Sequence, residues 1–202
     1  MKTEETRRIL SILRVNYPGT FNSYSKEDTQ VYLMLWDNSF KDYSYEEVAN
    51  TVNYIIQTDV REFAPNIALV KSVINKKFKN NVMPDERAWR VVLANAKCDR
   101  IEAKKRFDSL KGNIKKAIED PIFLSTLGAA NSYGQEKLKK QFLEKYHNAV
   151  EQDIQELNAG TITRLEFCER NNMPNDTINF LLPGKENTGL LELEPKGVNK
   201  NE

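Results

Sequence analysis

The sequence is poor in the residue types that build catalytic and metal-binding sites. Among its 202 residues there is one histidine, His147, and there are two cysteines, Cys98 and Cys168. Two cysteines this far apart are too few to crosslink a fold of this size, so we interpret them as reduced thiols. His147 has no cysteine, histidine or carboxylate at a regular ligand spacing, which favours a surface or packed side chain over a metal ligand or general base. We therefore predict no metal site, no catalytic residues and no enzyme.

Long apolar runs and nucleotide-binding motifs are also missing. No apolar stretch approaches the roughly 18–20 residues that cross a bilayer, and the acidic start, residues 1–5, does not resemble a secretory signal. The phosphate-binding pattern G-x-x-x-x-G-K-[ST] fails because Gly184-Lys185 is followed by Glu186, and Asn179 stands in place of the first glycine. We expect a soluble cytoplasmic protein that has no cofactor and no membrane partner.

Charge is nearly balanced overall, at +1, but it is unevenly distributed. Residues 71–116 contain 14 Lys or Arg and 5 Asp or Glu, whereas residues 1–70 contain 7 and 10, and residues 151–202 contain 5 and 10. A basic middle can bind nucleic acid by releasing counterions from phosphates, although lysines on amphipathic helices more often form a solvated face. The candidate nucleic-acid contacts are Lys104, Lys105, Arg106, Lys111, Lys115 and Lys116.

Four amphipathic helices are predicted within residues 1–79. The first is capped by Thr3 and stops before Pro18-Gly19, the second and third begin after Ser25 and Ser44, and the fourth follows Pro65-Asn66. The apolar stripe expected on the second helix consists of Val31, Met34, Leu35, Trp36 and Phe40. Short helices joined by short polar turns must bury their stripes against each other, which predicts a small amino-terminal bundle.

A second helical module is predicted over residues 84–158. It contains a helix after Pro84, a helical stretch over residues 100–118 that Gly112 breaks or kinks, and a longest helix over about residues 135–157. Apolar residues recur at intervals of three or four along that last helix, a pattern that most often packs into a protein's own core. The fold class is therefore all-α.

Residues 159–202 form an acidic carboxy-terminal segment punctuated by Asn, Gly and Pro. A short helix is predicted within residues 161–171, and two short apolar clusters follow at residues 178–182 and 190–194. Such clusters cannot bury much surface on their own. We expect a partly disordered segment that either folds on a partner or has no function.

A series of short motifs recurs in a fixed order along the predicted helices. Tyr17-Pro18 closes the first helix, Leu35-Trp36 lies in the second, Tyr45-Glu46 opens the third, and Phe63 and Pro65 precede the fourth. Their order and spacing resemble the amino-terminal domain of the phage replicative-helicase loader/inhibitor family.

The second module resembles the longer members of the same family. The matching residues are Ala88-Trp89, Phe107, Leu110, Ile114, Ala117-Ile118, Pro121, Leu124, Phe142 and Tyr146. The resemblance covers roughly residues 4–150. It departs at residues 98–101, Cys-Asp-Arg-Ile, where such proteins often have a Gly/Tyr/Asn-rich turn.

This resemblance implies a phage or prophage protein that binds the hexameric replicative DNA helicase and holds it inactive. The protein would then deliver the helicase to the origin-bound initiator for loading on single-stranded DNA. Family members have a flexible carboxy-terminal segment implicated in contacting the helicase, which favours a partner-binding role for residues 159–202. The candidate partner-binding residues are Phe180, Leu181, Leu182, Leu190, Leu191 and Leu193.

We further expect the second module to contact the helicase and the acidic amino-terminal bundle to contact the initiator. Two alternatives stay open. One is a helical DNA-binding replication or regulatory protein that uses the basic middle, with single-stranded DNA as a direct partner. The other is a pure inhibitor that captures the helicase without loading it.

Overall fold

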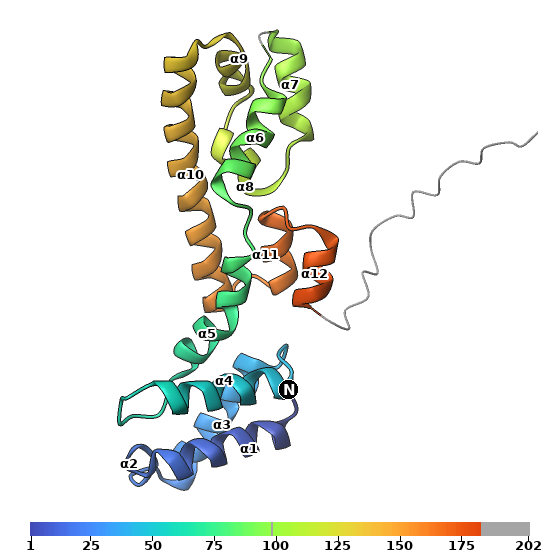
Figure 1. Cartoon of the computed structure of the whole chain (residues 1–202). Helices are drawn as coiled ribbons and strands as arrows, with labels where there is room; N and C mark the ends of the chain where they lie inside the picture. Colours follow the sequence, from blue (N-terminus) through green and yellow to red (C-terminus); the bar gives the residue numbers. More distant parts are fainter. Residues whose placement is uncertain (98, 183–202) are drawn as a thin grey trace, which may run out of the picture.

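The structure, a computed structural model, describes residues 1–97 and 99–182. Over these residues every regular element is a helix, which confirms the all-α prediction (Figure 1). The helices are α1 (Thr3–Asn16), α2 (Pro18–Phe21), α3 (Lys26–Phe40), α4 (Tyr45–Thr58), α5 (Ile67–Asn80), α6 (Asp85–Asn95), α7 (Arg100–Ser109), α8 (Gly112–Ile118), α9 (Pro121–Ala129), α10 (Ser132–Ala159), α11 (Arg164–Arg170) and α12 (Asn175–Leu181).

Side-chain caps set most of the helix starts in the amino-terminal bundle. Ser25 and Ser44 cap α3 and α4 as predicted, each accepting a hydrogen bond from the backbone N–H three residues later. The predicted Thr3 cap is wrong, because Lys2 occupies the cap position and Thr3 is already helical. The Thr3 hydroxyl instead donates to the Asp37 carboxylate at 2.6 Å, which ties α1 to α3.

The core of the bundle, which we call the bundle cluster, lies among α1, α3, α4 and the first half of α5. Figure 1 shows α1, α3 and α4 stacked beside one another, with α5 leaving towards the rest of the chain. A series of aromatic rings from Phe21 to Tyr43 lines one side, with successive centroids 5.1 to 6.0 Å apart. The buried residues of this cluster are Ile9, Leu13, Tyr17, Trp36, Phe40, Tyr43, Val48, Ala49, Val52, Ile55, Val70 and Ile74.

Helix α3 does not bury the stripe that its sequence suggested. Trp36 and Phe40 are fully buried, but Val31, Met34 and Leu35 are 53%, 55% and 48% exposed. At about 100° per residue, Trp36 and Phe40 lie on a different face from the other three. Within the bundle α3 packs mainly against α1, so only one of its two apolar faces is covered.

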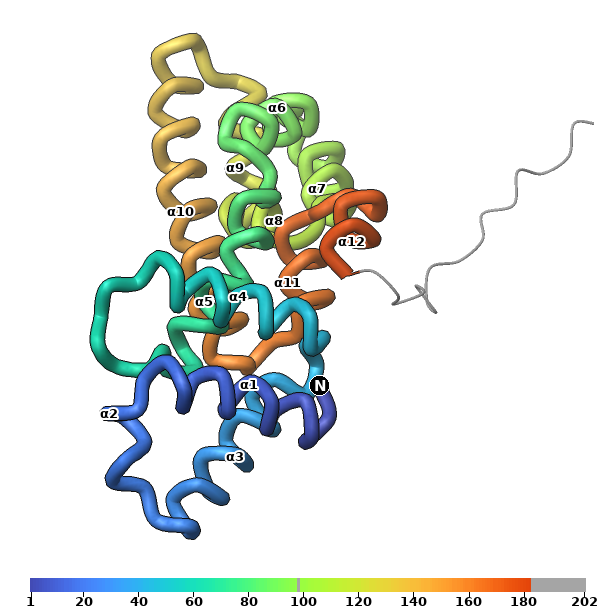
Figure 2. The backbone as a smooth tube through the Cα atoms, turned by 60° about the horizontal axis from the view of Figure 1, so that its bottom comes forward, coloured from blue at the N-terminus to red at the C-terminus, as the bar shows by residue number. Residues whose placement is uncertain are grey.

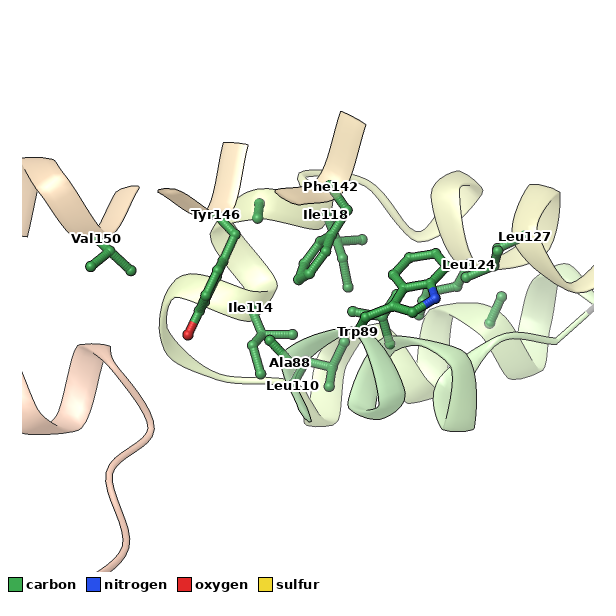
Figure 3. Packing of buried hydrophobic residues seen from close by; sticks show 13 residues of the cluster. Ala88, Trp89, Leu110, Ile114, Ile118, Leu124, Leu127, Phe142, Tyr146 and Val150 are labelled. Atoms are coloured by element: carbon green, nitrogen blue, oxygen red, sulfur yellow. The ribbon is translucent and has the colours of Figure 1, made fainter. Parts of the chain in front are cut away.

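The second module is built on α10, and its core, the upper cluster, lies where α6, α8 and α9 pack against that helix and α7 packs against α9 (Figure 3). Trp89 and Phe142 meet with ring centroids 5.8 Å apart, and the Tyr146 hydroxyl donates to the Met83 carbonyl at 3.0 Å. The predicted break at Gly112 is present, since α8 begins there with a φ of +55°. Helix α10 is the longest, at 28 residues.

A third apolar cluster, the junction cluster, joins the ends of α5 and α10 to α11 and α12. Phe78 on α5 faces Phe167 on α11, with ring centroids 6.1 Å apart and planes at 87°. Leu157, Leu181 and Leu182 complete one side of it. Residues 160–182 therefore fold back onto the body of the protein, where α11 lies beside α10 and α12 lies next to α11 (Figures 1 and 2).

Candidate interaction surfaces

The structure separates the predicted partner-binding residues. Phe180 is 78% exposed on α12, whereas Leu181 and Leu182 are 2% and 7% exposed in the junction cluster. A contact through Leu181 and Leu182 would first require them to leave that cluster. Three other candidates, Leu190, Leu191 and Leu193, lie outside the described residues.

The predicted basic run lies on α7 and α8, and most of it faces solvent. Lys104 and Lys105 on α7 and Lys111 and Lys116 on or beside α8 are exposed. Lys116 donates a hydrogen bond to the Gln152 side-chain oxygen at 3.0 Å. The other two candidates also have intramolecular partners. Arg106 pairs with Glu102 at 2.9 Å, and the half-buried Lys115 places its ammonium 5.0 Å from the centre of the Phe107 ring.

The amino-terminal bundle has an exposed apolar stripe on α3, formed by Val31, Met34 and Leu35. Three apolar side chains that are each about half exposed on one helical face are unusual for a surface without a partner. We call this the α3 patch. Its residues stood in the sequence prediction as core residues, so sequence reasoning found the residues but missed their exposure.

A cavity of about 500 Å³ lies between the bundle and the junction cluster. The turn between α3 and α4 and the start of α4 form one wall, and α5, the end of α10, α11 and α12 form the others. We call this the junction cavity. Its volume is in the range of small-ligand sites.

Charged side chains connect the bundle to α11 at this cavity. Arg164 makes a hydrogen-bonded ion pair with Glu47 at 2.9 Å and donates to the Asp42 carbonyl at 3.1 Å. Its guanidinium also lies 4.0 Å from the centre of the Tyr43 ring. Lys77 pairs with the same Glu47 carboxylate, so two cations neutralise one anion.

Lys71 is the buried charge at the junction cavity, and sequence reasoning did not single it out. Only 8% of the residue is exposed, and desolvation lowers the pKa of its ammonium, partly offset by Asp42. The Lys71 ammonium lies close to Gly160, the residue that caps the carboxyl end of α10. A Cβ atom built on Gly160 would be 3.2 Å from the Lys71 Nζ. Within residues 1–97 and 99–182 it makes no hydrogen bond or ion pair.

The remaining reactive groups occupy ordinary structural positions. His147 is exposed on α10, with its Nε2 2.8 Å from the Asp85 carboxylate. Burial raises the pKa of the Cys168 thiol to about 11, so near neutral pH it is not a thiolate nucleophile. The described part of the chain contains no group of three or more His, Cys, Asp or Glu side chains that could hold a metal ion.

No helix in the described part of the chain is both long enough and apolar enough to span a membrane. This finding fits the charged, amphipathic pattern of α10, whose 28 residues include many Lys and Glu.

Comparison with known families identifies the amino-terminal bundle. Residues 1–71 match a family model that describes the amino-terminal domain of the phage helicase loader/inhibitor gp39. The match covers α1 to α4 and the start of α5, which are the elements that carry the bundle cluster and the α3 patch. No curated protein and no solved structure matches the chain. The resemblance drawn from the motifs is thus confirmed over residues 1–71.

Proposed function

We propose that this protein is a phage or prophage replicative-helicase loader/inhibitor that binds the hexameric replicative DNA helicase in the host cytoplasm. The observation that carries this proposal is the match of residues 1–71 to the gp39 amino-terminal domain. While bound, the protein holds the helicase inactive. It then delivers the helicase to the origin-bound initiator for loading on single-stranded DNA.

The mechanism requires the protein to bind two states of the helicase with different affinity. A ligand that binds two states equally shifts no equilibrium, however tightly it binds. The loader must therefore prefer an inactive or open ring. Such a preference needs only binding and no catalysed reaction, and we propose that the protein is not an enzyme.

We propose a division of labour among three parts of the chain. Residues 1–79 contact the initiator, and the α3 patch supports this role because it offers exposed apolar side chains within residues 1–70, where acidic residues outnumber basic ones. Residues 84–158 and the carboxy-terminal segment, residues 159–202, contact the helicase. Phe180 supports the second contact because its ring is exposed at the end of α12.

A strand-displacement assay with the host's replicative helicase tests the proposal. Adding the protein should lower unwinding of a forked DNA in proportion to its concentration, and adding the cognate initiator should restore unwinding on origin DNA. Unwinding that stays unchanged at saturating protein would contradict the inhibitory role. Inhibition that the initiator does not relieve would instead identify the protein as a pure inhibitor that does not load the helicase.

Direct DNA binding is the second candidate function, and the exposed lysines of α7 and α8 favour it. Lys104, Lys105, Lys111 and Lys116 face solvent, where phosphates could reach them. Binding through several lysines would weaken steeply as salt rises, since each neutralised phosphate releases counterions. Replacing Lys104 and Lys105 by Gln should then lower DNA affinity and flatten the salt dependence in an anisotropy titration.

A further inference from the structure

Helix α12 is attached to the protein through apolar contacts. Ile178, Leu181 and Leu182 lie on one face of the helix, at positions three and four residues apart, and are buried in the junction cluster. In the described part of the chain, no hydrogen bond or ion pair joins residues 175–182 to another element. The docking of α12 therefore depends on a single small apolar face.

Helix α11, by contrast, is fixed by ion pairs at both ends. At its start, Arg164 pairs with Glu47 of the amino-terminal bundle at 2.9 Å. At its end, Arg170 pairs with Glu156 of α10 at 2.7 Å. These pairs hold α11 between two other elements whether or not α12 is docked beside it.

The turn between α11 and α12 is anchored by side-chain hydrogen bonds. The Asn171 amide donates to the carboxylate of Asp153, a buried residue of α10, at 3.2 Å. The Asn172 amide donates to the Lys111 carbonyl at 3.2 Å. The polar ties thus extend to residue 172 and stop there, so α12 can leave the junction cluster while α11 stays in place.

Helix α12 is too short to persist as a free helix. It has seven residues, and its N-cap residue, Pro174, provides no side-chain hydrogen bond to the first turn. Isolated helices shorter than about 12–15 residues are marginal in water. The order of α12 therefore comes from its docking, and segments with few buried contacts open at a lower free energy than the core.

The docked helix exposes one apolar side chain and hides two others beside it. Phe180 is exposed, whereas its neighbours Leu181 and Leu182 are buried in the junction cluster. Aromatic side chains are enriched among the residues that contribute most to protein–protein binding. Release of α12 would place all three side chains in solvent, and a segment this short would no longer confine Phe180 to the face opposite the leucines.

From this arrangement we propose that α12 is a releasable binding helix, which leaves the junction cluster and binds the replicative helicase through Phe180, Leu181 and Leu182. The choice of partner rests on the function proposed above, whereas the release is a property of the free protein. Docking in the junction cluster competes with this contact, because Leu181 and Leu182 cannot occupy both places. The apparent affinity for the helicase is therefore proportional to the fraction of molecules in which α12 is released.

Amide hydrogen exchange in the unaltered full-length protein tests the release. The helical amides of Ile178 and Leu182 in α12 are compared with those of Phe167 and Asn171 in α11, each corrected for its intrinsic exchange rate. The α12 amides should exchange about tenfold or more faster than the α11 amides, since α12 opens by itself. Equal protection of the two helices would overturn the proposal.

A variant of the surface under α12 tests whether release controls helicase binding. Ile162 belongs to the junction cluster and lines the same cavity as Leu181 and Leu182, so I162A weakens docking without changing α12 itself. The variant should speed exchange of α12 about tenfold or more and tighten helicase binding about threefold or more. The same truncation in the bundle cluster, I9A, should change neither quantity.

An exposed substitution keeps the test valid if I162A does not fold. F180S should leave α12 exchange unchanged and weaken helicase binding about tenfold. Unchanged binding by F180S, or faster α12 exchange in I162A without tighter binding, would overturn the proposal while leaving the proposed function in place. Failure of the unaltered protein to bind the helicase would overturn both.

Discussion

At the scale of single residues, Lys71 shows how a buried charge reduces stability when no side chain in the described part of the protein pairs with it. Desolvation lowers the pKa of its ammonium. The unfolded chain therefore binds the proton more tightly than the folded protein does. This destabilisation is fully present at pH values below the folded-state pKa, and it is relieved as the pH rises to the ordinary value of 10.5.

Replacing Lys71 by Met should accordingly stabilise the free protein at neutral pH. Exchanging a buried charge for an apolar side chain of similar length gains about 1 kcal/mol or more. Urea unfolding at pH 7 and at pH 10 measures the free energy of unfolding of both proteins. The gain in stability from K71M should be smaller at pH 10. A K71M protein that is less stable at pH 7 would mean that the ammonium has a stabilising partner in solution.

Single residues also mark where sequence reasoning stops. The caps at Ser25 and Ser44 were predictable because an N-cap depends on residues within one turn. The pairing of Arg164 with Glu47 was not, because the two residues are 117 positions apart in the chain. The burial of Lys71 against the distant end of α10 was equally hidden. A basic residue in an amphipathic helix gives no local signal of such a contact.

At the scale of elements, the break between α7 and α8 depends on Gly112. Its φ is +55°, and a Cβ there would lie 2.2 Å from the Arg170 carbonyl oxygen. Only glycine adopts this backbone conformation without strain while also leaving room for that close approach. The sequence indicated the break but not the neighbour from α11.

Changing Gly112 to Ala should therefore destabilise the protein by about 2 kcal/mol or more. Gly19 provides a matched control, since it lies in a helix and a Cβ there meets no atom within 4 Å. Thermal unfolding followed by circular dichroism should show a clear drop in Tm for G112A and little change for G19A. A similar Tm for the two variants would argue against the tight contact with Arg170.

The α3 patch is the element whose role the helical pattern could not settle. A stripe of apolar residues at helical spacing predicts burial, but it does not say whether the covering surface belongs to the same chain. In α3 two apolar faces exist, and the bundle covers only the one with Trp36 and Phe40.

Changing Leu35 to Ser should leave stability within about 0.5 kcal/mol of the unaltered protein, because surface substitutions cost little. It should weaken binding to the initiator if the α3 patch is the contact. A pull-down with the purified initiator measures this, with Y133S, another exposed apolar position, as the control. Unchanged initiator binding by L35S would mean that the contact lies elsewhere on the bundle.

At the scale of the whole molecule, α5 and α10 connect the parts. Val70 and Ile74 of α5 belong to the bundle cluster, while Phe78 of the same helix belongs to the junction cluster. Helix α10 similarly serves the upper cluster through Phe142 and Tyr146 and the junction cluster through Leu157. A ligand or partner at the junction therefore acts on elements that reach both modules.

The predicted order of helices corresponds closely to the observed one, because each helix is encoded by local periodicity and caps. The folding back of residues 160–182 could not be read in the same way. Their short apolar clusters find a surface only because Phe78 and Leu157, distant in sequence, present one together. This arrangement also decides how the carboxy-terminal segment should be truncated, since a cut at residue 160 would expose the junction cluster.

Binding to the replicative helicase is the central claim, and size-exclusion chromatography with light scattering tests it most directly. The full-length protein is mixed with the host's hexameric helicase in ATP and in ADP, beside a protein ending at Leu182 that keeps α11 and α12. The account predicts a co-eluting complex with the full-length protein that weakens when residues 183–202 are removed. Separate elution of the full-length protein and the helicase in both nucleotides would contradict the account.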